Sequence, residues 1–320
     1  MNSNTIPARL LAFGTDRDPI AIGTRTPGEA HRRAARPNSR IGSVIGSYRL
    51  ERRLGSGGTS VVYLAVDTGT GRTAAIKVMR RQLATDLEMV ERFEQEAVLL
   101  SRIEHPGLPR LLGRGTSTDG SPYLVMELLL GQTLAERLDI GPMAVDDVLD
   151  IALQAAAILA AVHAVGVVHC DLKPDNLFLV PDPLHPSRYG VVLIDFGVAI
   201  APALHPAACA RRQRRVIGTP PYMAPEQLSA ASLLDPRTDV YGFGCLVHEM
   251  LCGEAPFGGN IAEIVTAHRI AAPPRASQLR ADVPAELDSL LLAMLAKDPA
   301  KRPPTMAVVR AGLDRIGATA

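Results

Sequence analysis

The 320-residue sequence has few cysteines, little excess charge and no long apolar run, and each absence argues against a class of protein. Its four cysteines form no CxxC pair and show no zinc-site spacing with histidine, so neither a disulfide framework nor a structural zinc is indicated. The formal net charge of +1 argues against a broad surface for nucleic acid or anionic membrane. No stretch approaches the roughly 20 apolar residues of a membrane span, and none resembles a signal peptide. A cytoplasmic protein is expected.

The chain starts with a polar stretch and continues with strands and then helices. Residues 1–47 hold four prolines among polar residues and are expected to be a disordered tail. Five β-prone runs broken by glycine predict an antiparallel five-stranded unit with one helix over about 48–130. Residues from about 131 to 316 are mainly helical, and 317–320 form a short tail. Strands followed by helices predict an α+β fold of two unlike lobes.

The expected elements can be placed by residue number. The predicted strands are 48–54, 60–66, 73–78, 108–112 and 123–128. The main predicted helices of the larger lobe are 145–165, 238–252, 261–270, 285–296 and 306–316.

Residues 169–176 read His-Cys-Asp-Leu-Lys-Pro-Asp-Asn, and three of their side chains meet the needs of phosphoryl transfer. Asp171 offers a carboxylate to accept the proton of an attacking hydroxyl, Lys173 a cation, and Asn176 an oxygen ligand for Mg²⁺. The frame matches a known catalytic loop, His-x-Asp-Leu-x-x-x-Asn, in which Cys170 takes the place of an arginine. A single octapeptide can match by chance, so the prediction depends on the other motifs.

A glycine-rich turn between the first two predicted strands is a candidate phosphate-binding loop. Leu54–Val62 contains Gly55, Ser56, Gly57 and Gly58, whose backbone can approach phosphate oxygens closely. Clusters of this kind more often form plain turns. The loop therefore carries weight only together with its neighbours.

Three further motifs follow in order. Lys77 ends the third predicted strand, where a lysine is ordinarily solvated, but a strand beside the glycine loop would direct it at phosphates. Asp195, in Ile-Asp-Phe-Gly after an apolar run, would bind magnesium between phosphates. Ala224–Glu226 is the last motif, and Thr219 lies shortly before it.

With these five motifs, the chain from about Tyr48 to Ile316 resembles a eukaryotic-type protein kinase, in particular the bacterial PknB-like branch. The resemblance implies a kinase domain over 48–316. It implies that Glu96, rather than Glu94, pairs with Lys77.

The same resemblance implies the remaining site. Thr219 would bond to Asp171 and Lys173, and Lys173 is typical of the serine/threonine class. ATP and Mg²⁺, with Mn²⁺ as an alternative metal, are the implied cofactors, and Asn176 and Asp195 the metal ligands. Adenine would lie against the hinge from Glu127 to Leu129. The ring would be sandwiched by Leu54, Val62, Ala75 and Phe178. The family's third glycine is replaced by Ser60, which Gly58 would partly offset.

Cys170 suggests an unusual regulation. Most relatives carry an arginine there, which pairs with a phosphothreonine on the activation loop. No Ser, Thr or Tyr lies between Asp195 and Gly218, so both halves of that switch are missing. The sequence predicts a kinase that does not need activation-loop phosphorylation, although neutral drift of both features is an alternative. The basic stretch Arg211–Arg215 is a candidate site for a regulatory partner, and more ordinarily a solvated segment.

The predicted function is phosphorylation of Ser or Thr in protein substrates, without nucleic acid or a membrane span. Because the sequence stops after its last predicted helix, a soluble kinase is expected. A catalytically silent scaffold and a small-molecule phosphotransferase on the same fold are the alternatives. The intact Lys77, Asp171, Asn176 and Asp195 argue against the first, and the complete Gly-Thr-x-x-Tyr-x-Ala-Pro-Glu segment argues against the second.

Overall fold

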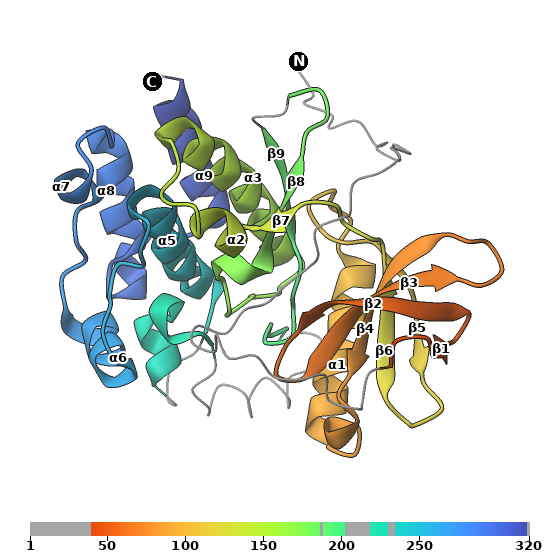
Figure 1. Cartoon of the computed structure of the whole chain (residues 1–320). Helices are drawn as coiled ribbons and strands as arrows, with labels where there is room; N and C mark the ends of the chain where they lie inside the picture. The colour runs from red at the N-terminus through yellow and green to blue at the C-terminus, as the bar shows by residue number, and fades with distance from the viewer. Residues whose placement is uncertain (1–39, 186–187, 202–217, 230–233, 319–320) are drawn as a thin grey trace.

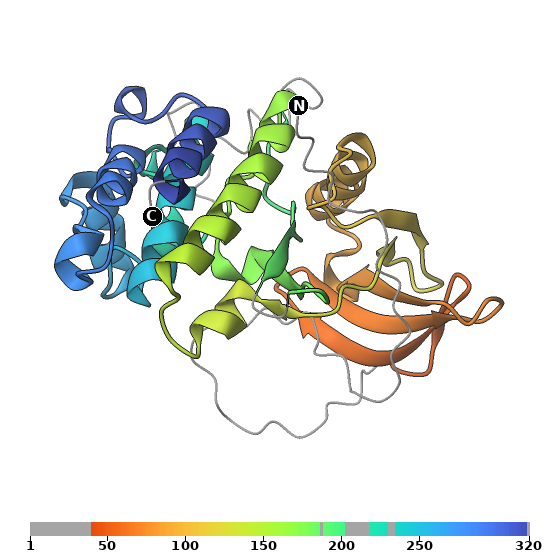
Figure 2. The ribbon, with the colours of Figure 1, turned by 90° about the horizontal axis from the view of Figure 1, so that it is seen from above.

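A computed structural model describes residues 40–185, 188–201, 218–229 and 234–318. A smaller lobe built on a sheet lies beside a larger helical lobe (Figure 1), and the view from above shows the same division (Figure 2). The predicted α+β architecture is confirmed. Residues 1–39 of the expected tail, Cys209 and the stretch Arg211–Arg215 lie outside the described residues.

The sheet of the smaller lobe has six strands rather than the predicted five, in the order β1-β2-β3-β4-β6-β5. Its strands are β1 (Val44–Ile45), β2 (Tyr48–Ser56), β3 (Ser60–Asp67), β4 (Thr73–Met79), β5 (Leu111–Thr116) and β6 (Pro122–Met126). The fourth predicted strand, at 108–112, therefore lies a few residues too early.

Strand β1 is the extra strand and falls within the stretch expected to be a tail. Gly46 has a positive φ of 59°, which allows a tight turn into β2, and Ile45 pairs with Tyr48. Ile45 is buried in the same cluster as Leu50. Two residues are too few to show an alternating pattern, so β1 could not be predicted from periodicity.

The single long helix of the smaller lobe, α1 (Leu87–Arg102), begins where Asp86 caps it. The Asp86 side chain accepts hydrogen bonds from the N–H groups of Glu88 and Met89, as a helix N-cap does. Phe93 and Ala97 pack in one cluster with Met79 and Leu124 of the sheet. The buried Glu96 lies on this helix and therefore faces β4.

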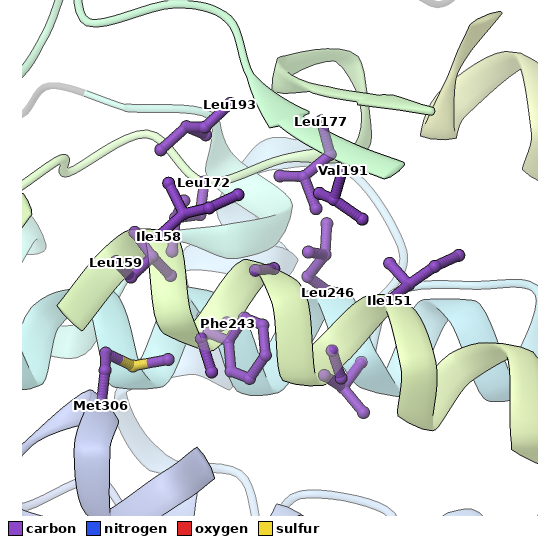
Figure 3. Packing of buried hydrophobic residues seen from close by; sticks show 14 of the residues in the cluster. Ile151, Ile158, Leu159, Leu172, Leu177, Val191, Leu193, Phe243, Leu246 and Met306 are labelled. Carbon is purple, nitrogen blue, oxygen red and sulfur yellow. The ribbon is translucent and has the colours of Figure 1, made fainter. Parts of the chain in front are cut away.

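The larger lobe is organised around α3 (Val145–Ala164), which contacts α5 (Pro236–Cys252) and α9 (Met306–Gly317). Figure 3 shows Ile158 of α3, Phe243 of α5 and Met306 of α9 in one apolar core. The remaining helices are α2 (Leu134–Leu138), α6 (Ile261–Ile270), α7 (Ala276–Leu279) and α8 (Ala285–Met294). In the part of the chain that the structure describes, no helix is both long and apolar enough to cross a membrane.

A small sheet, in the order β7-β8-β9, carries two motifs of the larger lobe at its ends. Its strands are β7 (Gln132–Thr133), β8 (Leu177–Pro181) and β9 (Tyr189–Leu193). Asn176 directly precedes β8 and Ile194 directly follows β9. The N–H of Ile194 donates to the carbonyl of Asn176 at 3.0 Å, so the hairpin brings the octapeptide beside Asp195.

Candidate functional site

Lys77 of β4 lies between two carboxylates that come from different elements. Its Nζ is 2.7 and 2.6 Å from the two carboxylate oxygens of Glu96, and 3.0 Å from Oδ1 of Asp195. Lys77 and Glu96 are both buried, whereas the Asp195 side chain is 37% exposed. The predicted partnership of Lys77 and Glu96 therefore exists in the structure, and Asp195 joins it from the larger lobe.

The electrostatics of this group follow from one ammonium shared by two carboxylates. Burial raises the pKa of Glu96 to about 6, against the lowering effect of Lys77. Burial alone would lower the pKa of Lys77, but attraction to Asp195 and Glu96 raises it, so Lys77 stays charged. Burial would likewise raise the pKa of Asp195, but Lys77 and the N–H of Gly197 lower it. The group therefore carries an excess negative charge.

Asp171, Lys173 and Thr219 form a second group, within the larger lobe. The hydroxyl of Thr219 donates to Oδ1 of Asp171 at 2.7 Å, and Nζ of Lys173 lies 3.1 Å from Oδ2. Lys173 also donates to the Thr219 hydroxyl at 3.3 Å. The three side chains named together from the sequence are therefore in mutual contact, and they bring together a carboxylate, an ammonium and a hydroxyl.

Asn176 is placed by its amide nitrogen, which donates to the carbonyl of Asp171 at 2.9 Å. Its carbonyl oxygen, Oδ1, is buried and has no hydrogen-bond partner among the described residues. A buried acceptor without a partner is costly unless a ligand uses it. Amide and carboxylate oxygens are the donors that Mg²⁺ prefers, so Asn176 and Asp195 fit the predicted metal.

The backbone of the octapeptide 169–176 is held by Asp239 of α5. Its carboxylate accepts from the N–H of His169 at 2.7 Å and of Cys170 at 2.8 Å, and contacts Nε2 of His163 at 2.8 Å. Cys170 has a positive φ of 65°, which a side chain other than glycine rarely adopts. The two bonds to Asp239 explain how this conformation is maintained at the residue before Asp171.

The residues predicted to surround adenine differ in their exposure. Ala75 and Phe178 are completely buried, and Leu54 nearly so, while Val62 is partly exposed. In the hinge, the N–H of Glu127 donates a hydrogen bond to the carbonyl of Arg110. The N–H of Leu129 donates no hydrogen bond within the described ranges, which leaves it available to a planar ligand.

A family model described as "Protein kinase domain" matches residues 48–312, which is most of the chain. The chain belongs to the protein kinase domain family. It is 38% identical over 262 residues to serine/threonine-protein kinase pkn2 of Myxococcus xanthus, covering 81% of this chain and 31% of that protein. It is 37% identical over 272 residues to PknL of Mycobacterium tuberculosis, covering 84% of this chain and 65% of that protein.

The solved kinase domain of Mycobacterium tuberculosis PknI matches with a TM-score of 0.65 at 25% identity, over 86% of this chain and 98% of that one. These bacterial relatives confirm the predicted resemblance. The chain spans 31% and 65% of the lengths of the two curated relatives named above.

Several residues of this kinase site escaped the sequence analysis. Gln227 donates from Nε2 to the carbonyl of Cys170 at 2.7 Å, and His163 contacts Asp239. Arg80 binds the glycine-rich loop. Each of these residues contacts backbone groups or another supporting side chain. The motif spacings used for the prediction therefore did not indicate them.

Proposed function

We propose that this chain is a serine/threonine protein kinase that transfers the γ-phosphoryl group of ATP to Ser or Thr hydroxyls of protein substrates. The observation that carries the proposal is the contact of Asp171 with both Lys173 and Thr219, together with the joining of Lys77, Glu96 and Asp195 across the two lobes. The arrangement offers a base, cations and metal ligands together.

The chain's own residues have distinct tasks in this proposal. Asp171 accepts the proton of the substrate hydroxyl and orients that hydroxyl toward the phosphorus. Lys173 stabilises the negative charge of the transferred group, and Lys77 binds the other phosphates while Glu96 holds it in place. Mg²⁺, or Mn²⁺ in its place, would neutralise charge on the phosphate oxygens when held by Asn176 and Asp195.

We also propose that the kinase is active without phosphorylation of its activation loop. Cys170 is 6% exposed and lies in an apolar cluster with Val168 and Ile200, against which Val198 and Leu234 pack. Val168 and Ile200 form a two-way backbone bridge with N···O distances of 2.9 and 2.8 Å. Apolar packing and this bridge support the start of the loop where relatives use an arginine and a phosphate.

Transfer of radiolabelled phosphate from ATP tests the first proposal. Purified protein should label itself or a generic substrate, whereas Asp171→Asn and Lys77→Met should reduce incorporation by about 10³-fold or more, because each removes a group that acts in the transition state. No incorporation by the unchanged protein, with ATP binding intact, would favour the silent scaffold. Activity on a small molecule but on no protein would favour the phosphotransferase.

Phosphatase treatment tests the regulatory proposal. Activity before and after treatment should agree, with mass spectrometry showing no functionally required phosphate. A large loss of activity tied to a phosphate on Thr219 or Tyr222 contradicts it. The cytoplasmic location and the partner at Arg211–Arg215 stay predictions of the sequence.

A further inference from the structure

Arg80, the residue directly after β4, reaches back to the glycine-rich loop. Its Nε and Nη2 donate to the carbonyl of Gly57 at 3.0 and 2.8 Å, and Nη2 also donates to the hydroxyl of Ser56 at 2.7 Å. The backbone N–H of Arg80 donates to the carbonyl of Thr59 at 2.8 Å. Arg80 therefore bonds to the loop on both sides of its tip, to Ser56 and Gly57 on one side and to Thr59 on the other.

The contact fixes the direction of a backbone donor. The Gly57–Gly58 peptide is trans, so its carbonyl and its N–H point in opposite directions. Because Arg80 holds the carbonyl, the N–H of Gly58 points away from the guanidinium. That N–H donates no hydrogen bond in the described part of the chain, and a Cβ built on Gly58 would meet nothing within 4 Å. Arg80 therefore leaves an oriented, accessible donor at the tip of the loop.

The loop needs such support because its third glycine is missing. Ser60, in that place, is 5% exposed and begins β3. Its carbonyl accepts from the N–H of Gly57 at 2.9 Å, which closes the tip as a tight turn. Lys77 and Arg80 belong to the same short segment of chain. Lys77, whose ammonium would bind phosphates, and Arg80, which supports the loop over them, therefore lie at the same end of β4.

We propose that Arg80 is a positioning residue that holds the glycine-rich loop so that its N–H groups meet the phosphates of ATP. The inference rests on the proposed kinase function and goes beyond it by assigning the loop's geometry to a residue outside the five motifs. A guanidinium can contact the Gly57 carbonyl and the Ser56 hydroxyl together, because its N–H groups form a rigid planar fork. A lysine keeps the charge without that fork.

The test compares Arg80→Ala and Arg80→Lys with Arg81→Ala, a matched loss of an exposed neighbouring arginine. Both Arg80 variants should raise KM for ATP about tenfold, equivalent to about 1.4 kcal/mol. KM for the peptide substrate and the thermal unfolding temperature should stay near those of the unchanged protein. The affinity for adenosine, which has no phosphates, should be unchanged, whereas that for a non-hydrolysable ATP analogue should fall by the same factor as KM rises. Arg81→Ala should change none of these.

Four outcomes overturn the inference. An unchanged KM for ATP in Arg80→Ala shows that the contact is dispensable. Normal behaviour of Arg80→Lys shows that charge alone matters. Equal losses for adenosine and the ATP analogue show a general structural defect, and tighter ATP binding by Arg80→Ala shows that the contact holds the loop away from phosphates. Failure of the unchanged protein to bind or use ATP would instead contradict the proposed function itself.

Discussion

Two buried ion pairs, one in each lobe, differ in how completely their groups are satisfied. Lys77 and Glu96 pair in the smaller lobe, and Arg302 and Glu226 pair in the larger lobe. Both pairs are close and almost completely removed from solvent. They nevertheless have different surroundings, and the difference separates a site made for a ligand from a contact made for the fold.

The Arg302 pair is complete within the protein. Arg302 donates from Nη1 and Nη2 to the two oxygens of Glu226 at 2.6 and 2.8 Å. Its other N–H groups reach the carbonyls of Ala296, Arg237 and Lys297 at 2.7, 2.9 and 3.1 Å. A guanidinium has five N–H donors, so this cation has no capacity left for a ligand.

The Lys77 group, in contrast, is incomplete. Glu96 and Asp195 share one ammonium, and nearby Asn176 keeps a buried acceptor without a partner among the described residues. The net negative charge of the Lys77 group and the unpartnered oxygen of Asn176 are unfavourable in the protein alone. Both become favourable once a cation binds. An unsatisfied buried group is therefore informative about function, while a satisfied one is informative about stability.

The largest effect on stability is expected for Arg302→Met. The change leaves Glu226 buried without its cation, which costs about 3–5 kcal/mol when one partner of a buried pair is removed. Chemical denaturation at pH 7 measures the loss. The double change of Arg302→Met with Glu226→Gln serves as the control and should recover part of it, because no uncompensated charge stays buried.

Lys77→Met should behave in the opposite way, with activity lost and a clearly smaller loss of stability. Glu96 already has a pKa raised to about 6 by burial, so it can take up a proton when Lys77 is absent, and Asp195 is partly exposed to water. Denaturation of the same preparation used for the activity assay makes the comparison. Equal stability losses for Lys77→Met and Arg302→Met would remove the proposed distinction between the two pairs.

A smaller but specific effect is expected for Asn176→Ala. Loss of Oδ1 should raise the Mg²⁺ concentration for half-maximal activity by at least about tenfold, since even indirect partners of a metal are worth that much. Asn176→Asp restores an oxygen but cannot donate to the carbonyl of Asp171, so it separates metal binding from support of the loop. An unchanged Mg²⁺ requirement in Asn176→Ala would show that the free oxygen is not a metal ligand.

The sequence could predict this site because its reactive side chains lie in short motifs. Asp171, Lys173 and Asn176 are fixed by one octapeptide, and the partnership of Lys77 with Glu96 followed from the kinase resemblance. The long helices were predicted well because α3 and α5 combine apolar side chains with lengths that only a helix suits. The predicted helix 261–270 agrees with α6 at both ends.

Features that depend on backbone contacts could not be predicted. Strand β1 is too short to show a period, and its turn depends on the positive φ of Gly46. The role of Arg80 depends on a carbonyl, which every residue has, so no pattern of side chains indicates it. The free oxygen of Asn176 becomes visible only when all its neighbours are placed.

The smallest effect concerns Glu249 of α5, a half-buried carboxylate for which no salt bridge is found in the part of the chain that the structure covers. Burial raises its pKa to about 7, against the lowering effect of a hydrogen bond from Tyr222. Its unfolded value is near 4.5, so between these values the folded chain holds a proton that the unfolded chain has released. The free energy of unfolding therefore falls as pH rises through this window.

Glu249→Gln keeps an acceptor for Tyr222 but cannot ionise, so it removes this dependence on pH. Relative to the unchanged protein, the free energy of unfolding of the variant should be about 1 kcal/mol higher at pH 8 and almost unchanged at pH 5. The gain is smaller than the shift in pKa alone would give, because the side chain is partly exposed. Thermal unfolding at both values measures the difference, and Glu254→Gln, at an exposed position two residues beyond the end of the same helix, is the matched control. A Glu249→Gln gain of the same size at pH 5 and pH 8 would show that burial of this carboxylate, unlike that of Glu96 and Glu226, has no electrostatic cost.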